Sequence, residues 1–69
     1  MRFLIRLTEG EDGYIVAECS ALPGCVSQGK TKEEALANIR EAIQGIVTVR
    51  RKHGLPIPEE QVAEVEVPA

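Results

Sequence analysis

The chain has 69 residues, enough for one small domain, and a domain of this size buries only about 60% of the surface that its unfolded chain exposes. The composition is that of a globular protein, with no apolar run near the roughly 20 residues of a membrane span and no signal peptide in residues 1–6, so we expect a cytoplasmic protein without membrane contact. The net charge of −3, one Phe, one Tyr and no Trp argue against direct nucleic-acid binding, which relies on clustered basic residues and aromatic stacking.

The first two predicted elements are strands. Residues 2–8 alternate with period two, and their apolar face consists of Phe3, Ile5 and Leu7. Residues 9–13 are polar and hold two glycines, which is typical of a hairpin connection. Residues 14–19 alternate again, with Ile15, Ala17 and Cys19 on one face and Tyr14, Val16 and Glu18 on the other. Because the connection is short, we expect the two strands to pair antiparallel.

A tight turn and a short third strand follow. Pro fixes φ near −65° and Gly tolerates positive φ, so Pro23-Gly24 suits the two central positions of a turn that begins at Leu22. Residues 25–28 then predict a short strand, which Gly29-Lys30 ends.

The helix has the strongest signal in the chain. Thr31 and Glu34 have the spacing of a capping box, and Gly54 is a natural stop. Between them, an apolar stripe with three-four spacing includes Leu36, Ile39, Ile43, Ile46 and Val47. Asn38 is expected on or near the opposite, polar side. Gly45 has no local explanation, since glycine in a helix interior costs about 1 kcal/mol relative to alanine.

A last strand is predicted at residues 62–67, where Ala63, Val65 and Val67 alternate with Glu64 and Glu66. The element order is then β-β-β-α-β in a single domain over residues 1–69. This order predicts an α+β fold, in which a mainly antiparallel sheet carries one helix on one face. The sheet residues expected against the helix are Phe3, Ile5, Leu7, Ile15, Ala17, Cys19, Val65 and Val67.

The second sheet face should be open, because a single helix covers only one side. Leu4, Tyr14 and Val16 are expected there, beside Arg2, Arg6, Glu18, Glu64 and Glu66. Partly apolar exposed surface on so small a domain often marks an interface. The sequence therefore predicts a homodimer or higher oligomer, with the size and the interface left open.

No residue pattern indicates catalysis, a metal site or a cofactor. Cys19 and Cys25 are spaced more widely than zinc-knuckle ligands, and the single His53 lies far along the chain. A nucleophilic Cys25 would need a base beside it, so we expect it to pack beneath the Pro-Gly turn. The carboxylates do not cluster as a two-metal nuclease requires, and residues 2–8 contain none. The basic run at residues 50–53 complements the negative end of the helix.

The order of the pieces resembles the HicB-like antitoxin family over essentially all 69 residues. The resemblance rests on Gly13-Tyr14-Ile15-Val16, Leu22-Pro23-Gly24-Cys25, residues 27–31, Glu33-Glu34-Ala35-Leu36 with Glu41-Ala42-Ile43, and Gly54 with Pro56-Ile57-Pro58.

This resemblance implies a partial ribonuclease-H-like fold that binds and masks a small basic HicA-like toxin, which cleaves mRNA. The expected contacts are the loop Leu22, Pro23 and Gly24, the open face around Leu4, Tyr14 and Val16, and the acids Glu18, Glu64 and Glu66. Many members carry a C-terminal DNA-binding domain, which we do not expect here because the chain reaches Ala69 directly after the last predicted strand. The alternative is a stand-alone oligomeric domain that binds a small ligand or another protein without any toxin.

Overall fold

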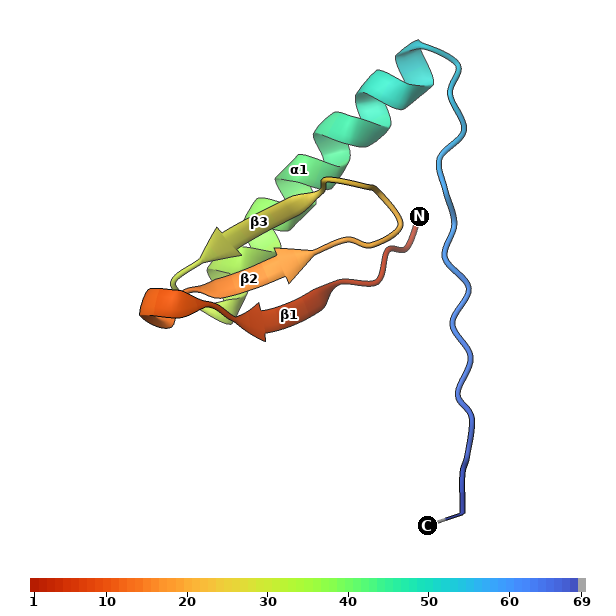
Figure 1. The fold of residues 1–69 in the computed structure, drawn as a ribbon. Coiled ribbons are helices and arrows are strands. Elements are labelled where there is room, and N and C mark those ends of the chain that lie inside the picture. The colour runs from red at the N-terminus through yellow and green to blue at the C-terminus, as the bar shows by residue number, and fades with distance from the viewer. Residues whose placement is uncertain (69) are drawn as a thin grey trace.

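A computed structural model describes residues 1–68 and shows a three-stranded antiparallel sheet followed by one long helix (Figure 1). The strands are β1 (Arg6–Glu9), β2 (Ile15–Glu18) and β3 (Val26–Gly29), in the spatial order β1-β2-β3. A short 3-10 turn, Glu11–Gly13, joins the first two strands, and helix α1 covers Lys32–Lys52. The α+β class and the order β-β-β-α are therefore confirmed.

The pairing register fixes which side chains lie beneath the helix. Leu7 pairs with Ala17, and Ala17 pairs with Ser27, so these positions share one face of the sheet. Ala17 is fully buried. The core combines Ala17, Cys19, Leu22, Cys25, Ala35 and Ile39, with Phe3, Ile5, Leu7 and Ile15 packed against it. Ala17 and Cys19 thus share a core with Ala35 and Ile39 of the helix, as predicted, and Phe3, Ile5, Leu7 and Ile15 lie on the same side of the sheet.

The Pro-Gly turn forms as predicted. The Cys25 N–H donates to the Leu22 carbonyl at 3.0 Å, and Gly24 has a φ of 80°. Positive φ at the third turn residue is the type II geometry, which glycine adopts without steric cost. The turn folds the Leu22 side chain inward, where it is 1% exposed, and places Cys25 beneath it at 2%.

Both ends of α1 are capped by the residues that the sequence indicates. The Thr31 hydroxyl accepts from the Glu34 N–H at 3.1 Å. At the other end Gly54 adopts a φ of 68°, its N–H donates to the Arg51 carbonyl at 3.2 Å, and the Leu55 N–H donates to the Arg50 carbonyl at 2.8 Å. These two bonds form a Schellman motif, which satisfies carbonyls that the helix leaves free.

The start of the helix lies unusually close to the end of β3. A Cβ placed on Gly29 would approach the Ala35 backbone nitrogen to 2.5 Å, so only glycine fits there. Asn38, expected on the polar side, instead donates from Nδ2 to the Gln28 carbonyl at 2.8 Å. It thereby satisfies a backbone acceptor on the free edge of β3.

The predicted strand at residues 62–67 is wrong for the single chain. This segment is extended but pairs with no strand among residues 1–68, and Val65 and Val67 are 82% and 77% exposed instead of packed on the helix. We call residues 59–68 the arm. In Figure 1 it runs past the N-terminus and away from the sheet. The radius of gyration, 14.2 Å, accordingly exceeds the roughly 11 Å of a compact chain of this length.

The first strand is also shorter than its alternation predicts. Hydrogen-bonded pairing begins at Arg6, opposite Glu18, although residues 2–8 alternate throughout. The reason is that β2 ends at Glu18 and the chain then turns, so residues 2–5 extend beyond their neighbour.

Candidate functional site

The sheet face opposite the helix is one candidate binding surface. The side chains that alternate with the core positions point there: Leu4, Arg6, Thr8, Tyr14, Val16, Glu18, Val26 and Gln28. We call these residues the open face. Leu4 and Val26 are 50% and 51% exposed, while Tyr14 and Val16 are half-buried. The face therefore exposes apolar side chains, a feature that protein-interaction surfaces share.

Charges on the open face are partly paired. Arg6 and Glu18 stand opposite each other in the ladder and form an ion pair with both side chains partly exposed. Exposed pairs of this kind contribute little to stability, about 0–1 kcal/mol. Further acidic charge lies at one end of the face, where Glu11 and Asp12 occupy the β1–β2 connection.

The predicted loop is only partly available for contact. Leu22 belongs to the core, so its side chain is not on the surface, whereas Pro23 and Gly24 are exposed. A small hollow joins these two residues to the open face, between Glu18 and Val26. The loop and the open face thus form one continuous surface.

Glu64 and Glu66 do not lie on the open face, contrary to the prediction. Both are exposed on the arm, where the strand that should have carried them to the sheet is not formed. The arm touches the body near its start. Ser20 Oγ donates to Glu60 at 2.8 Å, and Glu60 and Val62 border a hollow with Arg2 and Leu4.

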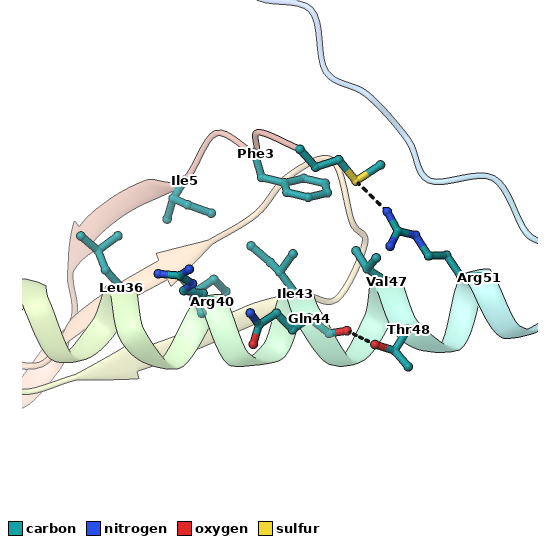
Figure 2. A pocket seen from close by; sticks show the side chains of 11 residues that line it. Phe3, Ile5, Leu36, Arg40, Ile43, Gln44, Val47, Thr48 and Arg51 are labelled. Atoms are coloured by element: carbon teal, nitrogen blue, oxygen red, sulfur yellow. Dashed lines mark hydrogen bonds between the residues drawn. The ribbon is translucent and has the colours of Figure 1, made fainter.

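The largest hollow is a groove between residues 1–5 and α1, shown in Figure 2, with a volume of about 710 Å³. Its lining combines apolar side chains, Met1, Phe3, Ile5, Leu36, Ile39, Ile43 and Val47, with the polar side chains of Arg40, Gln44, Thr48 and Arg51. We call it the helix groove. The Arg51 guanidinium lies 4.0 Å from the Met1 sulfur across it. The helix groove exists because α1 packs on β3 and β2 and leaves the β1 side uncovered.

Both cysteines are free thiols buried in the core, Cys19 at 1% and Cys25 at 2% exposure. Burial raises the pKa of the Cys25 thiol, and the neighbouring Cys19 adds to the effect. A raised pKa lowers the fraction of thiolate, which is the nucleophilic form. Among residues 1–68 no three His, Cys, Asp or Glu side chains gather in a way that could hold a metal ion. No helix in this range is long and apolar enough to cross a membrane.

Sequence reasoning missed two surface features. Val26 was assigned to a strand but not to the open face, although Cys25 inside and Val26 outside follow directly from alternation. The helix groove was missed because its existence depends on where the helix sits over the sheet, which periodicity does not specify.

Comparison with known proteins gives one family. A UPF0150 protein of Thermoplasma acidophilum is 46% identical over 69 residues, which is 100% of both chains. A UPF0150 protein of Synechocystis is 38% identical over 60 residues, covering 87% of this chain and 76% of the relative. One from Archaeoglobus fulgidus is 37% identical over 51 residues, 74% of each. No protein-family model and no solved structure matches the chain. The full-length match shows that this chain belongs to the UPF0150 family.

Proposed function

We propose that this chain is an antitoxin-type binding module of the cytoplasm, which masks a small basic HicA-like toxin that cleaves mRNA. The observation that carries the proposal is the open face: within residues 1–68 no helix covers this side of the sheet, and Leu4 and Val26 are half exposed on it. The ordered motifs from Gly13 to Pro58 that resemble HicB-like antitoxins support it.

The mechanism requires contact and charge, without chemistry by this chain. The partner would cover the open face together with Pro23 and Gly24, burying Leu4, Tyr14, Val16 and Val26. Glu18 and the acids of the β1–β2 connection would meet basic side chains of the toxin and speed its association. The toxin's RNA-binding surface would then be covered, which blocks cleavage.

Binding to a candidate partner tests the proposal. The probe is the product of any adjacent reading frame that encodes a short basic protein with a single His, produced as a catalytically inactive variant. We expect a complex, detected by pull-down and titration calorimetry. Failure of every such neighbour to bind contradicts the antitoxin role and leaves the stand-alone binding domain.

Val26→Lys locates the contact. It places a positive charge within the proposed interface, between the open face and the Pro23-Gly24 loop, so affinity should fall about 10- to 100-fold. Val49→Lys is the matched control, since Val49 is 55% exposed and lies on the helix, away from the sheet. Equal affinity of both variants would show that the partner binds elsewhere.

A further inference from the structure

Two segments have the side-chain alternation of strands yet no neighbouring strand within residues 1–68. Residues 2–5 continue the line of β1 beyond the end of β2, and residues 62–67 lie in the arm. Each leaves backbone N–H and C=O groups without ladder partners, as the edge of an unfinished sheet does. The two segments are therefore candidates to pair with each other.

The helix groove fits a strand added beside residues 2–5. Phe3 and Ile5 form one wall and point toward Ile43 and Val47 of α1 (Figure 2). Every second side chain of an added strand would point into this space. Val65 and Val67, which are 82% and 77% exposed, have the required spacing.

The charges select the same register. With Val65 and Val67 in the helix groove, Glu64 and Glu66 project to the opposite side of the sheet. Arg2 and Arg6 project to that side from the neighbouring segment, and both are exposed. Opposite charges on adjacent strands attract. The register shifted by one residue would instead bury the two carboxylates among apolar side chains, which is strongly unfavourable.

Within one chain, the arm does not pair with residues 2–5. It is held at its start by the bond from Ser20 to Glu60, and toward its C-terminal end it runs away from the sheet (Figure 1). Residues 63–68 span about 20 Å when extended, enough to lie along residues 2–5 of another molecule.

We propose that the arm of one copy adds a strand beside residues 2–5 of a second copy, with Val65 and Val67 in its helix groove. Reciprocal exchange gives a closed two-fold dimer. It also places the partner's Glu64 and Glu66 beside Leu4 and Arg6, at the border of the open face. This inference concerns self-assembly and stands independently of the toxin.

The mass in solution tests the exchange. Sedimentation equilibrium at micromolar concentration should give twice the chain mass of 7.5 kDa. Val65→Asp combined with Val67→Asp should weaken the dimer at least about 100-fold, because two buried apolar contacts per arm are lost. Val62→Asp is the control and should leave the dimer intact, since Val62 borders a hollow with Arg2 and Leu4 of its own chain and precedes the exchanged residues 63–68. Circular dichroism confirms that each variant is folded.

Mixing separates arm exchange from any other dimer. Val47→Asp damages the helix groove without altering the packed core, and should be monomeric alone. Mixed with the arm double variant, it should form heterodimers, visible by native mass spectrometry, through the one arm and one groove that remain intact. A monomeric wild type, a double variant of wild-type affinity, or a mixture that stays monomeric would each overturn the proposal. The outcome of these experiments does not depend on whether a toxin binds the open face around Val26.

Discussion

Gly29 and Gly45 show how the same residue type has opposite consequences in different surroundings. At Gly29 an added Cβ would meet the Ala35 nitrogen at 2.5 Å and the Glu34 carbonyl carbon at 2.8 Å, and backbone cannot move aside locally. At Gly45 an added Cβ meets nothing within 4 Å. Gly45 is exposed on α1, beside a shallow apolar hollow formed with Ile46, Val49 and Leu55. The first glycine is required by packing, and the second is not.

Alanine substitution at the two sites should therefore change stability in opposite directions. Gly29→Ala should lower the free energy of unfolding by about 1–3 kcal/mol through overpacking. Gly45→Ala should raise it by about 0.5–1 kcal/mol through helix propensity. Urea denaturation of both variants at one protein concentration measures the difference. A loss at Gly45 comparable to that at Gly29 would indicate that another surface covers Gly45.

The buried thiol of Cys25 links stability to pH. Its pKa is raised in the folded protein above the ordinary value of 9.0 by burial and by Cys19, so the folded state holds the proton more tightly than the unfolded state. The stabilisation is fully present below about pH 9.0, the unfolded value, and is lost as pH rises through the folded pKa.

Wild-type protein should accordingly lose more stability between pH 7 and pH 10 than Cys25→Ala does. The comparison uses the change with pH, because the substitution itself also removes core contacts. Urea denaturation at both pH values gives the two changes. Equal changes for both proteins would mean that the Cys25 thiol does not titrate differently on folding.

At the scale of elements, the N-terminus of α1 is capped by the side chain of Thr31. Because Thr31 accepts the Glu34 N–H, Thr31→Ala should lower the free energy of unfolding by about 1 kcal/mol. Thr48→Ala is the matched control on the same helix. The Thr48 hydroxyl donates to the Gln44 carbonyl of its own helix at 2.8 Å. Such a bond to the carbonyl four residues back does not stabilise a helix, so the loss of this hydroxyl should be neutral or slightly stabilising. Thermal unfolding of both variants distinguishes them, and equal losses would contradict the capping role.

Strand prediction succeeded where alternation coincided with a neighbour in the same chain. Residues 6–8 and 15–18 have such neighbours, joined by a short connection, and they pair antiparallel as predicted, while β1 runs one residue further, to Glu9, than predicted. Residues 2–5 and 62–67 alternate equally well but remain unpaired, because alternation reports that a segment is suited to a sheet and not which strand lies beside it. The helix was predictable to within a residue because both its ends carry local capping signals.

At the scale of the whole molecule, the candidate site was only partly predictable. Leu4, Tyr14, Val16 and Glu18 share the open face, as alternation indicates. Leu22 is buried because the turn folds it inward, an outcome that depends on tertiary packing. Glu64 and Glu66 lie on the arm, which pairs with no strand among residues 1–68, and alternation alone does not specify which strand a segment joins.

The proposed arm exchange and the proposed toxin masking involve different surface residues. The proposed exchange would use residues 2–5, the helix groove and the arm, whereas the proposed masking would use the open face and the Pro23-Gly24 loop. The two surfaces meet at Leu4. Variants at Val65 and Val26 can therefore separate assembly from partner binding.

Growth rescue tests the central claim, the masking of a toxin by the open face, most directly. Cells expressing the neighbouring basic protein in active form are supplied with this chain, with Val26→Lys or with Val49→Lys, at matched protein levels. We predict arrest without this chain, recovery with the wild type and with Val49→Lys, and continued arrest with Val26→Lys. Arrest that the wild type does not relieve, or equal recovery with both variants, would contradict the account.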